Sequence, residues 1–273
     1  MKYDFHCHTK EGSIDAKVDV LSYARFLKGK GFQGMMVTDH NSYKGYRAWL
    51  KQKQEGLAPE DFTVLRGIEY DTLDAGHILV IMPDHVELKL LELRGMPVQL
   101  LARVVHKYGG ILGPAHPYGA KFLSAMCSKR LEKDPSLIHE FDFVEAFNTC
   151  ETPFSNEKAR ALARMHGKPM FGGSDSHKEA YIGTAYTELP EKISCCDDLI
   201  RLVKERAEIT CGGTEREPKI QRPFTKAVLG MCWKVYNRGL AVVKQHARKL
   251  RLEEIGLRPV RWRHRHAVSN GGE

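Results

Sequence analysis

Histidine and carboxylate side chains recur where short apolar runs of this chain begin or end. Thirteen histidines are present, and six of them, together with three acidic residues, flank such runs. Residues i and i+2 of an extended strand face the same side, so pairs with one intervening residue can act together. Imidazole and carboxylate groups without thiolates suit zinc, manganese or iron. The set comprises His6, His8, Asp39, His40, Glu69, His77, His116, Asp175 and His177.

Eight apolar runs separated by amphipathic segments predict strands that alternate with helices. Nearly continuous apolar strands are typical of a parallel sheet covered on both faces, and their number favours a closed barrel over an open sheet. The predicted strands are Tyr3–His8, Gly34–His40, Val64–Tyr70, Gly76–Met82, Gly110–Ala115, Phe143–Phe147, Met170–Gly173 and Thr184–Leu189. The predicted helices are Val18–Lys28, Tyr43–Gln54, Pro97–Tyr108, Asn156–His166 and Asp198–Ala207.

A barrel would bring these polar side chains to one face. The carboxyl ends of its parallel strands lie on the same side, where loops form active sites. Nine converging side chains exceed the four to six positions of one ion, so the pattern predicts two or three divalent ions. The alternative is a set of core histidines that only satisfy hydrogen bonds, and the recurrence of the pattern argues against it.

The ordered series HxH, TDHN, GIE, GH, AHP and GSDSH resembles the polymerase and histidinol phosphatase (PHP) superfamily, over residues 1 to about 190. The resemblance implies an α/β fold, a distorted (β/α)7 barrel, with a C-terminal helical extension added in this chain. It also implies two or three bound divalent ions, zinc, manganese or iron, and hydrolysis of phosphoesters.

The resemblance assigns metal ligands residue by residue. His6, His8, Glu69 and Asp175 match one site, and Glu69 as a bridge, with His77 and His116, matches a second. A third site matches His40 and His177 and takes an acidic residue from the loop after HxH.

That loop offers both Glu11 and Asp15. A serine shortly before an aspartate is the closest family pattern, which favours Asp15 as the ligand. The alternative is that one of the two caps the following helix. Asp39 is expected to orient a neighbouring imidazole, and Asp175, His177 and Asp39 are the candidate catalytic residues.

The net charge of +8 is concentrated at one end of the 273-residue chain. Residues 219–273 hold 13 Lys and Arg against 3 Asp and Glu, an excess of +10, which leaves 29 basic and 31 acidic residues in residues 1–218, a balance of −2. We therefore expect a metallo-phosphoesterase barrel over 1–218 and a basic helical extension over 219–273, with its main helix near Thr225–Glu254.

Three interpretations of this extension stay open. The preferred one packs an apolar stripe onto the barrel; the others are a patch for nucleic acid and a membrane-surface helix. The stripe comprises Val228, Leu229, Cys232, Val235, Tyr236, Leu240 and Val243.

The sequence also bears on the compartment. Asp4 and His6 stand where a secretory signal needs an apolar run, and the apolar runs are too short to span a bilayer. Seven cysteines without a disulfide-like spacing indicate reduced thiols. A cytoplasmic protein is expected.

The predicted activity is hydrolysis of a small phosphomonoester, of the histidinol-phosphate or nucleoside-monophosphate type, by a metal-activated hydroxide. The alternatives are a phosphodiesterase or exonuclease acting on short oligonucleotides, and a non-catalytic barrel that binds nucleic acid or a partner. Basic candidates for contact with the substrate phosphate are Lys10, Lys17, Lys44 and Lys121.

Overall fold

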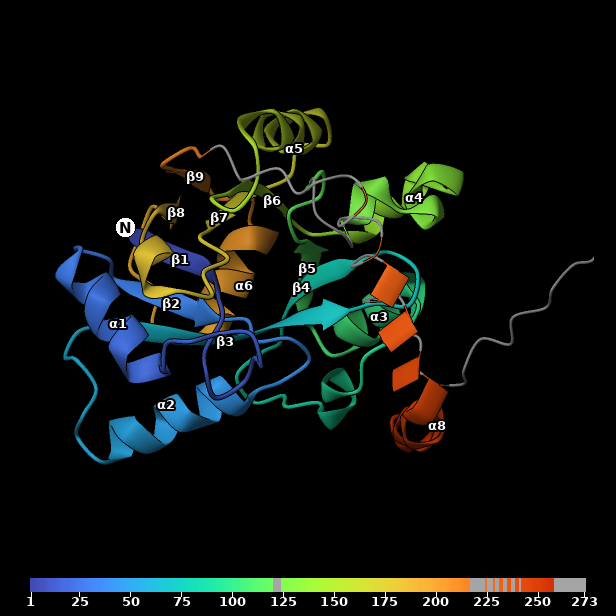
Figure 1. Cartoon of the computed structure of the whole chain (residues 1–273), viewed down its shortest axis with the longest axis horizontal. Coiled ribbons are helices and arrows are strands. Elements are labelled where there is room, and N and C mark those ends of the chain that lie inside the picture. The colour runs from blue at the N-terminus through green and yellow to red at the C-terminus, as the bar shows by residue number, and fades with distance from the viewer. Residues whose placement is uncertain are drawn as a thin grey trace, which may run out of the picture.

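Two sheets form a distorted barrel in the computed structural model of the chain (Figure 1). The structure describes residues 1–119 and 124–216, and in the extension residues 224, 228, 231–232, 235–236, 239–240 and 242–257. A seven-stranded sheet has the order β5-β4-β3-β2-β1-β8-β9, and a second sheet pairs β6 with β7. Strand β6 lies against β5, and β7 lies against β1 and β8, so the two sheets curl into one ring. The predicted α/β barrel is confirmed.

All eight predicted strands are present. They are β1 (Lys2–Cys7), β2 (Gly34–Val37), β3 (Thr63–Asp71), β4 (His77–Ile81), β5 (Ile111–Pro114), β6 (Val144–Asn148), β7 (Met170–Gly173) and β8 (Ala185–Glu188). A ninth strand, β9 (Thr210–Gly213), pairs with β8 and was not predicted, because ladder pairing through the backbone needs no apolar pattern.

Strand direction differs from the prediction. Strands β1, β2 and β3 run parallel, as do β6 and β7, but β3–β4, β4–β5, β1–β8 and β8–β9 are antiparallel. Residues 72–76 are too few for the crossover that a parallel β3–β4 pair requires. The expectation of an all-parallel sheet was therefore wrong, and His77 lies at the amino end of β4, opposite Asp71.

The five predicted helices are confirmed at nearly the expected positions. They are α1 (Val20–Gly29), α2 (Lys44–Gln54), α3 (Val98–Lys107), α5 (Pro153–Met165) and α6 (Cys196–Lys204). The short α4 (Lys129–Lys133) and the 3-10 segments η1 (Lys89–Glu92), η2 (Ala125–Cys127), η3 (Pro135–Glu140) and η4 (Glu179–Tyr181) were not predicted.

The interior of the ring is filled with side chains. The Phe143 and Phe171 rings stack at 4.0 Å between centroids, and Phe5 lies 5.1 Å from Phe171. Apolar residues of α6, including Leu199 and Val203, join the same buried cluster. The interior is a packed core, which leaves the loops at one end of the strands to form a site.

The extension is attached through its last helix, α8 (Gln245–Glu254), near η1 (Figure 1). Leu252 is 2% exposed and joins the main core cluster, and Lys107 Nζ donates a hydrogen bond to Ile255 O just after the helix. Helix α8 therefore belongs to the packed body of the molecule. Among the described residues, no helix has the length and apolar character needed to cross a membrane.

Most of the predicted apolar stripe is exposed where it is described, and Leu240 is half-buried. Val228, Val235, Tyr236 and Val243 are exposed, from 38% for Val228 to 78% for Val243. The preferred interpretation, packing of this stripe on the barrel, was wrong for these residues, since helical spacing defines a face without specifying what covers it. The domain division at 218/219 stays a prediction, because residues 217–223 lie outside the described part.

Candidate metal centre

The predicted site residues come from the loops and strand ends at one end of the barrel. His6 is the second-last residue of β1, and His8 follows the strand. His40, His116 and the Asp175–His177 loop follow β2, β5 and β7. Three of the five described non-glycine residues with positive φ lie here: Asn41 (47°), His116 (31°) and Asp175 (48°). Such strained backbone persists only where its surroundings fix it.

Close approach of β7 to β1 requires Gly173. A Cβ at this position would lie 2.2 Å from His6 Cβ, a distance that side chains do not tolerate. The next residues continue the contact, because Asp175 N donates to His6 O at 2.9 Å. This contact carries the Asp175 carboxylate next to the two histidines of β1.

Four predicted ligand atoms meet in a first group. His6 Nε2 and His8 Nε2 are 3.1 Å apart, and His8 Nε2 lies 3.3 Å from both Glu69 Oε2 and Asp175 Oδ1. His6 Nε2 is 3.5 Å and 3.7 Å from the same two oxygens. Ligands bound to zinc at 2.0–2.2 Å in a tetrahedron lie roughly 3.3 Å apart, so the spacing fits one ion.

A second group forms around the other oxygen of Glu69. Oε1 lies 2.8 Å from His77 Nδ1 and 3.1 Å from His116 Nε2. Glu69 is 1% exposed, and its two oxygens face two separate groups of imidazoles. The antiparallel turn from β3 to β4 brings His77 to this face from the opposite strand end.

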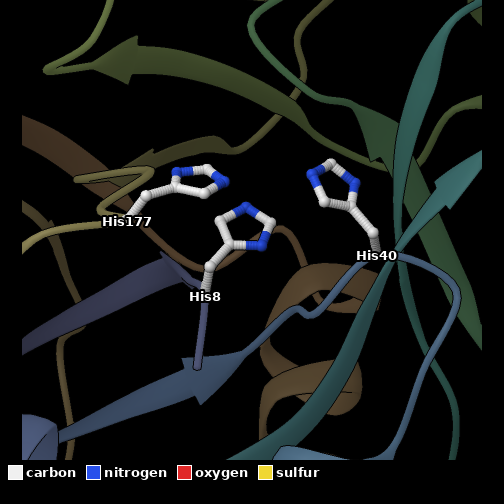
Figure 2. Close-up of side chains that lie close together, drawn as sticks. All are labelled: His8, His40 and His177. Atoms are coloured by element: carbon white, nitrogen blue, oxygen red, sulfur yellow. The ribbon is translucent and has the colours of Figure 1, made fainter. Parts of the chain in front are cut away.

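His8, His40 and His177 form a third group (Figure 2), in which the rings face one another from three different strand ends. The ring centroids of His8 and His177 are 4.2 Å apart, and those of His8 and His40 are 4.7 Å apart. One nitrogen from each of the three lies within 4.8 Å of the others.

Asp15 and Glu11 occupy different places. Asp15 Oδ2 lies 3.1 Å from His177 Nε2, so it faces the third group. Both Glu11 oxygens accept from Val20 N at 3.2 Å, which places Glu11 at the start of α1. Burial opposes ionisation of Asp15, but the hydrogen bond and charge of His177 lower its pKa to about 2.

Asp39 holds the loop that carries His8. Its Oδ1 accepts from Thr9 N at 2.6 Å and from Ser13 Oγ at 2.9 Å, and its Oδ2 accepts from Thr9 Oγ1 at 2.7 Å. Ser13 Oγ in turn lies 3.1 Å from His8 Nδ1. These contacts fit the predicted orienting role and give no support to a catalytic one.

Two buried carboxylates were missed. Glu145 Oε1 is 2.8 Å from His6 Nδ1, and Oε2 accepts from His116 N. Asp71 Oδ1 is 3.0 Å from His77 Nε2. Sequence signals existed: Glu145 interrupts an apolar run, and Asp71 shares a strand face with Glu69 at i+2.

Asn148 lines the cluster. Its Nδ2 donates to Glu145 Oε2 at 3.2 Å and to Asp175 Oδ2 at 3.3 Å. Among the basic candidates, Lys17 is next to the cluster, since its backbone N–H donates to His177 O at 3.1 Å. Lys121 lies outside the described residues.

Opposite charges dominate the electrostatics. Burial alone would raise the pKa of Glu69, yet His77, His40 and His6 hold it well below its usual range. Burial would lower the pKa of His77, but Glu69 and Asp71 raise it to about 10. The Glu69 carboxylate is thus held ionised, as a metal ligand must be, whereas His77 has to release its proton to bind an ion.

Unsatisfied buried atoms indicate that a cation fits. His40 Nδ1, Glu69 Oε2, both nitrogens of His77 and His177 Nε2 have no hydrogen-bond partner among the described residues, although carboxylate or imidazole groups lie within 4 Å. Orphaned buried polar atoms are costly, and atoms that approach without hydrogen-bond geometry can share one cation. The donor set of imidazoles and carboxylates suits zinc, manganese or iron.

A family model described as PHP-associated matches residues 153–207, from α5 through β7 and β8 to just beyond α6. The matched stretch contains Asp175 and His177. PsfC from Pseudomonas syringae has a similar structure over 86% of this chain and 98% of its own, with 17% identity and a TM-score of 0.59. The PHP-associated model confirms the resemblance to the PHP superfamily over residues 153–207.

Two further structures share this PHP-like fold. A candidate metal-dependent phosphoesterase from Bifidobacterium adolescentis covers 75% of this chain and 96% of its own, with 15% identity and a TM-score of 0.54. An amidohydrolase from Chromobacterium violaceum covers 77% and 98%, with 13% identity and a TM-score of 0.54. At these identities the likeness establishes the fold. No curated protein matches the chain.

Proposed function

We propose that this chain is a metal-dependent phosphoesterase that hydrolyses a small phosphomonoester, of the histidinol-phosphate or nucleoside-monophosphate type. The position of Glu69 carries the proposal: Oε2 lies 3.3 Å from His8 Nε2, while Oε1 lies 2.8 Å from His77 Nδ1. One carboxylate between two sets of ligands suits a pair of ions that act together on a phosphoester. The fold shared with a candidate metal-dependent phosphoesterase supports the same reaction class.

The proposed ligands follow the three groups. The first site takes His6, His8, Glu69 and Asp175; the second takes Glu69, His77 and His116; the third takes His40, His177 and Asp15. Bound zinc, manganese or iron would lower the pKa of a water from 15.7 toward about 7 and would neutralise phosphate oxygens.

The chain's own residues orient these ligands and handle protons. Glu145 and Ser13 each contact the second ring nitrogen of a histidine, His6 and His8 respectively, which leaves Nε2 directed into the cluster. His177 is the most exposed of the six imidazoles, at 26% of its side chain, and lies beside the exposed Asp15. The leaving alkoxide would take its proton from His177 or from water, because the neighbouring histidines hold the pKa of Asp175 well below its usual range and keep that carboxylate ionised.

A monoester is the preferred substrate because its phosphate has three non-bridging oxygens. Three groups of donors adjoin one another around Glu69 and His8, whereas a diester offers only two such oxygens. The competing proposal, a phosphodiesterase or exonuclease on short oligonucleotides, draws on the +10 excess of the extension. A barrel that only binds a partner would leave the orphaned ligand atoms without a role.

Metal content and a substrate panel test the proposal. The full chain, expressed in metal-supplemented medium, should carry two or three equivalents of transition metal by elemental analysis. The manganese-loaded protein should turn over small phosphomonoesters faster than bis(p-nitrophenyl) phosphate or a short oligonucleotide. Less than one equivalent, with no uptake of added zinc, iron or manganese, would overturn the metal assignment; preference for the diesters would favour the competing proposal.

A further inference from the structure

The Asp71 carboxylate contacts the His77 ring on the side opposite Glu69. The two carboxylates are two residues apart on β3, and the imidazole lies between them: Nδ1 is 2.8 Å from Glu69 Oε1 and Nε2 is 3.0 Å from Asp71 Oδ1. Asp71 is 2% exposed. The Asp71–His77 approach is a close contact between a carboxylate and an imidazole without hydrogen-bond geometry. A carboxylate beside the second ring nitrogen is the usual support of a metal-bound histidine.

The second oxygen of Asp71 is held by two donors. Arg94 Nη2 lies 2.9 Å from Oδ2, and Asn41 Nδ2 donates to the same oxygen at 2.8 Å. The backbone of Asp71 is held by two further hydrogen bonds. Asp71 N donates to Asn41 Oδ1 at 3.0 Å, and Gly95 N donates to Asp71 O at 2.8 Å. The Arg94 side chain is only 12% exposed, so its charge balances a buried carboxylate.

Arg94 is also one of the residues through which the C-terminal extension contacts the barrel. Its guanidinium carbon lies 5.5 Å from the centre of the Tyr236 ring, within range of a cation–π contact. Arg248 of α8 donates to the carbonyl oxygen of Arg94. Tyr236 and Arg248 of the extension both contact Arg94, Arg94 pairs with Asp71, and Asp71 lies against His77, so these five residues connect the extension to the cluster.

We propose that Asp71 and Arg94 are positioning residues for His77, and that the extension sets the metal affinity of the Glu69–His77–His116 group through Arg94. This inference rests on the metal-binding part of the proposed function, but not on the identity of the substrate. The extension then helps to position a metal ligand, whether or not its basic residues also bind a partner.

Metal titration of the full-length apo protein tests the inference. Zinc is added against a chromophoric chelator, and cobalt is added in parallel to record the ligand-field spectrum. Asp71→Asn and Arg94→Gln should each weaken one equivalent by about 10–100-fold, the usual effect of losing such a support, and leave the others unchanged. Arg248→Gln should weaken the same equivalent by a smaller factor. The number of equivalents and the cobalt spectrum should stay close to wild type, because no ligand is removed.

Two matched controls separate positioning from general damage. Arg251→Gln changes an exposed arginine of the same helix, and Arg47→Gln changes an arginine that pairs with Glu92 on the barrel surface. Neither should alter any zinc constant. Thermal melts of each apo variant report folding separately from affinity.

Three outcomes would overturn the inference. If Asp71→Asn and Arg94→Gln leave every zinc constant within twofold of wild type, neither residue positions a ligand. If Asp71→Asn removes an equivalent and changes the cobalt spectrum while Arg94→Gln does nothing, Asp71 is itself a ligand. If Arg248→Gln behaves like Arg251→Gln, the extension plays no part. A wild-type chain that binds no metal would instead refute the proposed function.

Discussion

Glu145 Oε1 lies 2.8 Å from His6 Nδ1, and its other oxygen accepts the backbone N–H of His116. One carboxylate, 1% exposed, thus orients a side chain of the first ligand group and the backbone of a residue in the second. Removing its charge should disturb both groups together.

We therefore predict that Glu145→Gln lowers metal affinity at both groups by about 10–100-fold, as is usual for a support of metal-bound histidine. Chelator-competition titration of the apo protein measures the constants. Glu188→Gln, an exposed glutamate of β8, is the control. Constants equal to those of wild type would show that Glu145 does not position the ligands.

Glu69→Gln should have a larger effect. An amide cannot bridge two cations as a carboxylate does, so phosphatase activity should fall on the order of a thousandfold and metal content should drop. Initial rates with a phosphomonoester and elemental analysis measure the two effects. Glu132→Gln on the surface of α4 is the control, and circular dichroism verifies the fold. Near-normal turnover would show that Glu69 does not bridge two ions that the reaction requires.

Sequence patterns predicted the convergence of the candidate side chains better than they predicted the sheet. Except for Asp15, each candidate ligand adjoins an apolar run, and burial of those runs forces the polar ends together. Strand direction was not predictable from the same runs, because an apolar strand buried on both faces reads alike in parallel and antiparallel sheets. The short connection between β3 and β4 is the feature that indicates an antiparallel pair, because a parallel pair needs a longer crossover.

The supporting residues were hidden for another reason. Asp71 and Glu145 lie inside strands, where a carboxylate is tolerated only if tertiary contacts pair it. Those contacts come from Arg94, 23 residues beyond Asp71, and from His6, 139 residues before Glu145. Whether the extension's apolar stripe packs on the barrel also depends on long-range contacts. The helical spacing of the stripe does not predict those contacts.

A pH-dependent contact outside the site joins His106 to Asp142. Nε2 lies 3.0 Å from Asp142 Oδ2, and this hydrogen bond raises the pKa of His106 although burial opposes it. Stability from the pair is complete below the unfolded-state pKa of about 6.5 and is lost as the pH rises through the higher folded-state pKa. Because the side chain is 38% exposed, solvent screens the effect.

His106→Gln should therefore lower the melting temperature at pH 5.5 by more than at pH 9. Melts of variant and wild type across this range give the difference, in which titration of the other histidines cancels. His85→Gln in an exposed loop should show no such trend. A loss of melting temperature in His106→Gln that grows with pH would contradict the predicted direction of the pH dependence.

Docking of α8 can be measured with two leucines of the same helix. Leu252 is 2% exposed and Leu250 is 48% exposed. A buried leucine changed to alanine typically costs about 2–5 kcal/mol, so Leu252→Ala should destabilise the chain or release α8, whereas Leu250→Ala should do neither. Thermal melts and limited proteolysis of the extension detect the two effects. Equal behaviour of the two variants would mean that α8 is not docked.

Basic residues of α8 are poorly placed to bind nucleic acid. Arg248 is 9% exposed and bonded to Arg94 O, and Arg251 and Lys249 lie 2.8 Å and 3.9 Å from Glu254 and Glu253. Each phosphate contact contributes roughly −0.7 to −0.9 to the log–log slope of affinity against salt.

Changing Lys249 and Arg251 to Gln should therefore leave the slope for a short oligonucleotide unchanged. If the extension binds the oligonucleotide, changing Arg258, Arg261, Arg263 and Arg265 to Gln should flatten the slope instead, since these four arginines account for much of the +10 excess and follow α8 in sequence. Fluorescence anisotropy at several salt concentrations measures both slopes. A flatter slope for the Lys249 and Arg251 variant would show that their ion pairs open on binding and that α8 itself contacts phosphate.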